Sequence, residues 1–159
     1  MGQVLSRADL IEVRSRLRHE GKKVVFTNGC FDIVHRGHVE YLTKAKALGD
    51  VLFVGMNSDA SVRRLKGKAR PVVCQDDRAF VLAALRAVDY VCLFEEDTPY
   101  ELIKAIIPDI LVKGADWAIE SIVGKDIVEQ AGGTVQTIEF VPNRSTTDII
   151  NNIIHGKSC

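Results

Sequence analysis

Two histidines three residues apart, with a glycine between them, follow an apolar run near the start of the chain. The stretch TNGCFDIVHRGH covers residues 27–38 and places Gly37 between His35 and His38. Residues three apart lie on one face of a helix, and a glycine there lets a ligand approach the backbone. Because the free N–H groups of a helix N-terminus attract anions, the pattern predicts a phosphate site whose natural ligand is a polyphosphate.

A pair of histidines at this spacing has other interpretations. It could be a surface or core pair without a ligand, or half of a zinc site. Zinc would need further ligands, and the remaining histidines, His19 and His155, fall in segments with helical patterns near the chain ends. Neither the dinucleotide pattern GxGxxG nor the P-loop pattern GxxxxGKS/T occurs. The whole string, with Gly29 and Asp32, is more specific than the pair alone.

Cations cluster in the segment RRLKGKARP, residues 63–71, and two more arginines follow in the helical pattern at 76–87. The cluster could be a solvated loop. Its place after a predicted strand favours a second interpretation, in which Lys66 and Lys68 bridge an α-phosphate and another anionic substrate. Arg86 could cap the end of its helix, and Arg78 could pair with a neighbouring aspartate.

Two polar segments follow strands later in the chain. RSTTD, residues 144–148, precedes an apolar helical pattern, so Ser145 is a candidate N-cap. A second helix N-terminus facing the first would hold a triphosphate at both ends. In KGADW, residues 113–117, Gly114 would let a nucleoside approach closely, although the segment could equally be a turn with a half-buried tryptophan.

The elements that must position these residues alternate between β-branched runs and amphipathic segments. This alternation predicts an α/β fold with a parallel sheet. Right-handed crossovers make it a Rossmann-like, doubly wound sheet of about five strands, with ligands at the carboxyl ends of the strands. The predicted strands are 23–27, 51–56, 90–94, 110–113 and 134–140. The predicted helices are 6–19, 37–48, 60–65, 76–87, 98–107, 121–131 and one that begins near 145.

Length and composition limit the classes of protein. With 159 residues, we expect a single domain over 1–159, with 1–21 as an N-terminal helical extension packed on it. Lys and Arg balance Asp and Glu at 21 each, so neither nucleic acid nor a membrane is expected as a partner. The chain has no apolar run near the ~18 residues of a membrane span and no leader pattern. A cytoplasmic location with reduced cysteines is expected.

The string GxFDxxHxGH, present at residues 29–38, resembles the signature of the nucleotidylyltransferase (cytidylyltransferase-like) superfamily. The resemblance implies an HxGH nucleotidylyltransferase fold in which both histidines contact nucleotide phosphates and stabilise charge at the α-phosphate. It implies that STT and the preceding arginine hold the β- and γ-phosphates, and that Asp116 accepts from ribose hydroxyls. The implied nucleotide contacts are Cys30, Phe31, Gly37, Lys68, Arg86, Gly114, Asp116, Arg144, Ser145, Thr146 and Thr147.

Longer segments narrow the resemblance to the adenylyltransferase half of the bacterial ADP-heptose synthase family. They are TNGCFDIVHRGHVEYL, NSDASVRRLKG followed two residues later by RPV, FEEDTP, DILVKGADW and NRSTTDII. That resemblance implies transfer of AMP from ATP to D-glycero-D-manno-heptose 1-phosphate, with release of pyrophosphate, on the route to lipopolysaccharide core heptose. It also implies a stand-alone form, a homodimer that works with a separate heptose kinase. Asn28, Asp32 and Asn57 would contact the sugar phosphate.

The residue types favour charge neutralisation over covalent catalysis. No third group that would orient a Cys30–His pair is evident. A phosphate monoester is already ionised near neutral pH, since its second pKa is about 6, so it could attack ATP without a base. His35, His38 and Lys66 would then be catalytic, with Mg²⁺ on the triphosphate and Asp32 as a candidate contact. The alternatives are a cytidylyltransferase for glycerol 3-phosphate and a nucleotide-binding domain without turnover.

Overall fold

The computed structural model describes residues 1–139 and 144–156. Its strands form one six-stranded sheet in the order β1-β4-β3-β2-β5-β6, and every pairing is parallel. This confirms the predicted Rossmann-like α/β sheet. The strands are β1 Gln3–Val4, β2 Val24–Gly29, β3 Val51–Asn57, β4 Tyr90–Phe94, β5 Ile110–Gly114 and β6 Thr134–Ile138.

The extra strand relative to the prediction is β1. It has two residues and pairs Gln3 with Tyr90 and Val4 with Val91. Two residues are too few to show the alternation that identifies a strand in a sequence. The predicted strand 134–140 ends at Ile138, and its last residue lies outside the described part of the chain.

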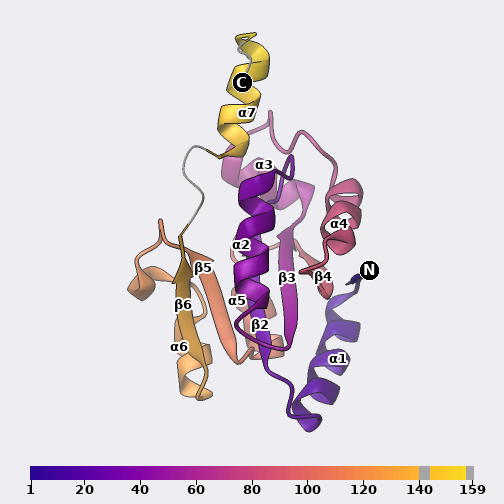
Figure 1. Cartoon of the computed structure of the whole chain (residues 1–159), viewed down its shortest axis with the longest axis vertical. Coiled ribbons are helices and arrows are strands. Elements are labelled where there is room, and N and C mark those ends of the chain that lie inside the picture. Colours follow the sequence, from indigo (N-terminus) through magenta and orange to yellow (C-terminus); the bar gives the residue numbers. More distant parts are fainter. Residues whose placement is uncertain (140–143, 157–159) are drawn as a thin grey trace.

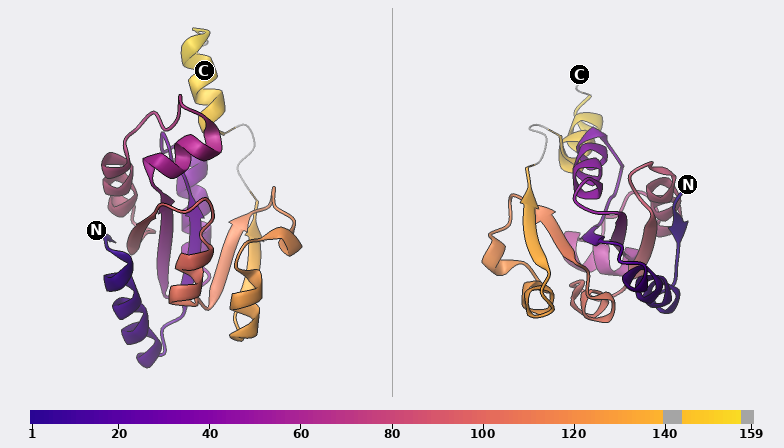
Figure 2. Two further views of the ribbon diagram at one scale, coloured as in Figure 1. Left: turned by 180° about the vertical axis from the view of Figure 1, so that it is seen from behind. Right: turned by 60° about the horizontal axis from the view of Figure 1, so that its bottom comes forward.

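Helices cover both faces of the sheet (Figures 1 and 2). On one face, α2 and α4 pack over a core that contains Val25, Val54 and Val112. On the other, α1, α5 and α6 pack over Phe26, Phe53 and Leu111. The helices are α1 Arg7–His19, α2 Arg36–Lys46, α3 Asp59–Lys66, α4 Gln75–Ala84, α5 Tyr100–Ile106, α6 Lys125–Gln130 and α7 Thr146–Ile154, with a 3₁₀ turn at Ile119–Ser121.

Two of the helices that are shorter than the sequence predicts end or begin where the backbone changes conformation. The helix predicted over 76–87 ends at Ala84, because Leu85 has an extended backbone with ψ 132°. The helix predicted over 121–131 is divided by Gly124, which has φ +85°, so α6 begins only at Lys125. Among the described helices, none is long and apolar enough to cross a bilayer.

The strand order reverses between β2 and β5. Both strands end at the same edge, so the loop after Gly29 and the loop after Gly114 meet there. Such a reversal is where parallel α/β sheets bind ligands. The helix α7 extends beyond this edge at the top of Figure 1, so the sequence motifs after β2, β5 and β6 gather at one end of the molecule.

Candidate active site

The loop after β2 has a strained backbone. Phe31 has φ +48° and Ile33 has φ +50°, in the left-handed region that few non-glycine residues occupy. Such residues cost about 1–3 kcal/mol each and persist only where the surroundings determine them. Three contacts, made by Asp32, Arg78 and Thr146, hold this loop.

The Asp32 carboxylate lies in the centre of these contacts with no exposed side-chain surface. It accepts hydrogen bonds from Arg70 Nε at 2.6 Å and from the N–H groups of Val72 and Val73 at 2.9 and 3.0 Å. Burial alone would raise the pKa of Asp32, but these donors lower it below its usual value. Both oxygens are therefore engaged. The geometry favours a positioning role for Asp32 over the substrate or metal contact expected from the sequence.

Arg78 is the second support. It is 1% exposed and donates hydrogen bonds to the carbonyl oxygens of Cys30, Asn57 and Val73 and to the Asp59 carboxylate. It thereby ties α4 to the loops after β2 and β3. Sequence reasoning considered only a local pair with a neighbouring aspartate and missed this contact, which spans 48 residues to Cys30.

The two histidines stack on each other at the start of α2. His35 is the N-cap, and its Nδ1 accepts a hydrogen bond from the N–H of Gly37 at 3.1 Å. The ring proton of neutral His35 is therefore on Nε2, where it can be donated to a ligand. Its ring centroid lies 3.9 Å from that of His38, which also meets the edge of Phe31 at 5.3 Å.

His38 is neutral at physiological pH. Burial, assisted by His35, lowers its pKa from 6.5 to about 4, and its Nδ1 is buried without a hydrogen-bond partner. Burial and then the charge of Arg144 lower the pKa of His35 as well. The pair therefore meets a phosphate as neutral N–H donors, and a bound anion would raise both pKa values.

The buried His38 should make stability depend on pH. Between pH 6.5 and about 4 the unfolded chain protonates this histidine and the folded chain does not. Stability is therefore complete above 6.5 and falls as the pH drops, by up to about 3 kcal/mol from this group. Urea unfolding at pH 7 and 4.5 should show a smaller pH dependence for His38→Gln than for the wild type. Equal dependence in the two proteins would contradict the buried neutral state.

Gly37 allows a close approach of two groups. A Cβ at this position would lie 2.9 Å from the ring of His35 and 3.3 Å from Cβ of Arg144. The absent side chain therefore makes room for His35 to turn back over α2 and for the segment before α7 to reach α2. The sequence predicted only that the glycine would admit a ligand.

The N-terminus of α7 is fixed at this edge. Ser145 is its N-cap and accepts a hydrogen bond from the N–H of Asp148 at 3.0 Å, as the sequence predicts. Thr146 Oγ1 donates to the carbonyl oxygen of Asp32 at 2.7 Å. The hydrogen bond joins residues 114 positions apart and brings the first turns of α2 and α7 to the same loop.

A cavity of about 510 Å³ opens beside these helix ends. Its walls come from the loop after β2, the end of α3, the segment before α5 and the start of α7. A recess of about 130 Å³, which reaches Tyr41 and Gly114, adjoins it. Of the residues predicted from the sequence, the cavity collects Asn28, Cys30, Phe31, Asp32, His38, Asn57, Lys66, Thr146 and Thr147.

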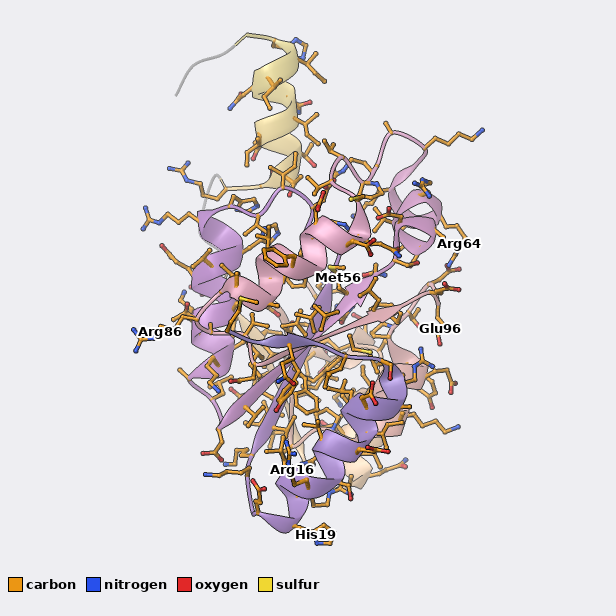
Figure 3. The ribbon with its side chains drawn as sticks, turned by 90° about the vertical axis from the view of Figure 1, so that its right-hand side faces the viewer. Arg16, His19, Met56, Arg64, Arg86 and Glu96 are labelled. Atoms are coloured by element: carbon orange, nitrogen blue, oxygen red, sulfur yellow. The ribbon has the colours of Figure 1, made fainter. Side chains whose placement is uncertain are left out.

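Other predicted residues lie outside this lining. Lys68 and Asp116 are exposed neighbours of it, and Arg86 lies elsewhere. Because α4 ends at Ala84, Arg86 falls in the turn that leads to Tyr90 at the amino end of β4, and its side chain points outward (Figure 3). The position of Arg86 does not support the phosphate contact that the resemblance implied.

Cys30 is in the cavity wall but is a poor nucleophile. Burial raises the pKa of its thiol, although Lys66, Arg78 and Arg70 oppose the shift. The nearest hydrogen-bond partner of Sγ is the side-chain oxygen of Asn57 at 4.0 Å. No base activates the thiol in the described contacts, which is consistent with a site that acts by binding charge.

The sequence agrees with a known family over most of its length. The family described as cytidylyltransferase-like matches residues 26–152, which contain both histidines and the start of α7. The chain belongs to the cytidylyltransferase-like family. The family match thus covers the whole edge of the sheet at which the cavity opens.

Among curated proteins, this cytidylyltransferase-like chain is similar to the bifunctional protein HldE of several bacteria. It is 55% identical over 152 residues to that of Trichlorobacter lovleyi, covering 96% of this chain and 31% of the relative. It is 57% identical over 149 residues to that of Syntrophotalea carbinolica, covering 94% and 30%. The chain therefore spans about a third of the length of the curated relatives it matches.

Two solved structures resemble the fold of this cytidylyltransferase-like chain. A lipopolysaccharide core biosynthesis protein from Thermoplasma volcanium has a TM-score of 0.62 and 30% identity, covering 76% of this chain and 98% of that protein. A pantoate-β-alanine ligase from Francisella tularensis, solved with an ATP analogue and β-alanine, has a TM-score of 0.63 at 17% identity, covering 98% and 78%. The second likeness concerns the fold alone.

Proposed function

We propose that this protein is a nucleotidylyltransferase that transfers AMP from ATP to D-glycero-D-manno-heptose 1-phosphate and releases pyrophosphate. The observation that carries the proposal is the meeting of two helix N-termini, those of α2 and α7, at the reversal of strand order. The similarity to HldE over 96% of the chain supports this choice of substrates, which follows from the resemblance of the sequence segments. The product, ADP-heptose, would serve the synthesis of lipopolysaccharide core heptose.

The triphosphate would lie between the first turns of α2 and α7. Backbone N–H groups at both helix ends attract anions, and the hydroxyl of Thr147 adds a donor near the cavity. Nε2 of His35 can donate from the α2 side. Arg144, whose Cβ comes close to Gly37, would bring a permanent cation to the β- and γ-phosphates.

In the transfer step, an oxygen of the sugar phosphate attacks the α-phosphorus of ATP. A new P–O bond forms, the bond to the β-phosphate breaks, and the electron pair leaves with pyrophosphate. The attacking oxygen is already ionised, so no base has to remove a proton. His38 on α2 and Lys66 on α3, which both line the cavity, would stabilise the charge that grows on the α-phosphate.

The side chains around the cavity do not form a cage for Mg²⁺. Its carboxylates are Asp32, which is fully hydrogen-bonded, and Asp97, which pairs with Arg64 at 2.6 Å. No cluster of three metal-binding side chains occurs in residues 1–139 and 144–156. We therefore propose that the triphosphate, and not these side chains, would hold Mg²⁺, which would neutralise part of its charge.

The remaining expectations belong to the same proposal. Residues 1–159 would form a single domain that acts in the cytoplasm, as a homodimer. A heptose kinase would supply its sugar phosphate. Its substrates would be small molecules, with nucleic acid and membranes outside its function.

A pyrophosphate-release assay tests the reaction. It would offer ATP or CTP with heptose 1-phosphate or glycerol 3-phosphate, and we expect turnover with ATP and heptose 1-phosphate. The family description makes a cytidylyltransferase the second candidate. Turnover only with CTP and glycerol 3-phosphate would establish that candidate. No turnover with any of the four pairs would favour a nucleotide-binding domain without catalysis.

Lys66→Ala should lower kcat by about 10- to 100-fold and change the Kd of ATP less than about threefold. The reason is that a cation beside the α-phosphate stabilises the charge that develops there in the transition state. Lys66 is the last residue of α3 and reaches the cavity wall. Arg63→Ala, an exposed position on the same helix outside that wall, is the matched control. Steady-state kinetics with ATP-binding titrations would check the prediction. Equal losses in kcat and ATP affinity would make Lys66 a ground-state anchor.

A further inference from the structure

Lys113 lies on the face of the sheet opposite α2. Side chains alternate along a strand, and Val112 packs with the core on the α2 face while Leu111 packs on the other face. Lys113 therefore points to the same side as Leu111. On β2, Thr27 bonds the hydroxyl of Tyr41 in α2 at 2.7 Å, so Asn28 also points away from α2.

Lys113 and Asn28 are neighbours across the two strands that flank the reversal. The pairs Val25–Ile110 and Phe26–Leu111 define the register, and its continuation places Asn28 beside Lys113. Both residues line the main cavity and the adjoining recess. They form one wall of the site, across the sheet edge from the stacked histidines.

Both side chains have unused binding capacity. Oδ1 of Asn28 is buried without a hydrogen-bond partner. The ammonium of Lys113 lies 5.4 Å from the ring centroid of Trp117, and within the described residues no carboxylate forms an ion pair with it. Lys113 is partly buried, and although the charge of Asp116 acts on it, the two form no ion pair. Desolvating a cation without an ion pair is costly, so a ligand that brings a negative charge would be bound favourably.

We propose that Lys113 binds the phosphate group of the acceptor substrate, and that Asn28 accepts a hydrogen bond from a hydroxyl of the same molecule. This rests on the proposed nucleotidyl transfer. The triphosphate would be held at the helix ends and the acceptor on the opposite face. The acceptor oxygen would then attack the α-phosphorus from the side opposite to the leaving pyrophosphate. In-line displacement requires that arrangement.

The charge state of Lys113 adds a pH signature. Burial lowers its pKa to about 8, against the opposing influence of Asp116 and Cys30. The ammonium form that binds phosphate is thus present below pH 8 and lost above it. The titratable and charged groups that line the cavity from other elements are Cys30, Asp32, His38, Lys66, Arg70 and Asp97.

The test compares Lys113→Met with the wild type. We expect KM for heptose 1-phosphate to rise about 10- to 100-fold, because a hydrogen bond to a charged group is lost. The Kd of ATP should stay within about twofold, since the triphosphate is bound elsewhere. Lys44→Met, an exposed position on α2, is the control. The thermal midpoint of Lys113→Met should not fall, because the change removes a buried charge.

Lys113→Arg distinguishes a role in phosphate binding from a purely structural role of this lysine. It should recover part of the acceptor affinity. We expect kcat/KM of the wild type to decline above pH 8, and that of Lys113→Arg to show no such decline. An unchanged acceptor KM in Lys113→Met, or a loss of ATP affinity instead, would overturn the inference.

Titration calorimetry separates this inference from the proposed function. Heptose 1-phosphate and glycerol 3-phosphate would each be titrated into the wild type and Lys113→Met, with a non-hydrolysable ATP analogue present. Binding of only glycerol 3-phosphate to the wild type would refute the proposed substrate and still test Lys113 with that ligand. Equal binding of either phosphate to both proteins would refute the role of Lys113 alone. If neither phosphate binds the wild type, the acceptor role fails together with the proposed function.

Discussion

His38→Ala should lower kcat by about 100- to 1,000-fold, the usual cost of removing one preorganised donor to a transition-state charge. Its ring lies in the cavity wall, is packed against His35 and Phe31, and carries a neutral N–H donor. The ring is already oriented, so little reorganisation is needed when charge develops. Pre-steady-state measurement of AMP transfer would isolate the chemical step.

His19→Ala is the control for this prediction. His19 is exposed at the far end of α1, away from the cavity (Figure 3). This variant should have wild-type kcat. An unchanged kcat in correctly folded His38→Ala would remove the imidazole from the mechanism.

Arg78→Met should have the largest effect on stability, about 3–5 kcal/mol, because it leaves buried groups without their partner. Asp59, whose side chain is 19% exposed, would lose an ion pair at 2.7 Å. The carbonyl oxygens of Cys30, Asn57 and Val73 would lose their donors as well. Urea denaturation at pH 7 would give the difference in the free energy of unfolding.

Arg16→Met provides the matched comparison. Arg16 is exposed on α1 and meets Glu20 at 3.8 Å (Figure 3). Exposed pairs of this kind contribute about 0.3–0.5 kcal/mol, so this variant should stay close to the wild type. Similar losses for the two variants would mean that Arg78 does not hold the loop as the contacts indicate.

The sheet and the positions of the helix starts at its edge could be predicted from sequence because their signals are local. Alternating apolar runs identify strands, and Ser145 before a helical pattern identifies a cap. The roles of Asp32 and Arg78 could not be predicted in this way. Asp32 bonds Arg70, 38 residues away, and Arg78 bonds Cys30, 48 residues away. No periodicity in the sequence indicates such contacts.

Arg86 and Lys113 differ in what the local sequence pattern indicated about them. The helical pattern continues past Ala84, so the predicted helix included Arg86, which lies two residues beyond the observed helix end. Nothing in the pattern indicated the turn. Lys113 was passed over, although a lysine inside an apolar strand is itself a signal. A charged side chain there must find solvent or a ligand at the strand end.

The hydrogen bond from Thr146 to Asp32 determines how α7 is attached to the loop after β2. Within the described residues, α7 has no fully buried side chain. The hydrogen bond from Thr146, in its first turn, therefore attaches α7 to the rest of the domain. A triphosphate bound to both α2 and α7 would form a second link between segments more than a hundred positions apart. Part of the binding free energy of the nucleotide would then stabilise α7 in its position at the edge of the sheet. ATP would complete the fold as well as enter the reaction.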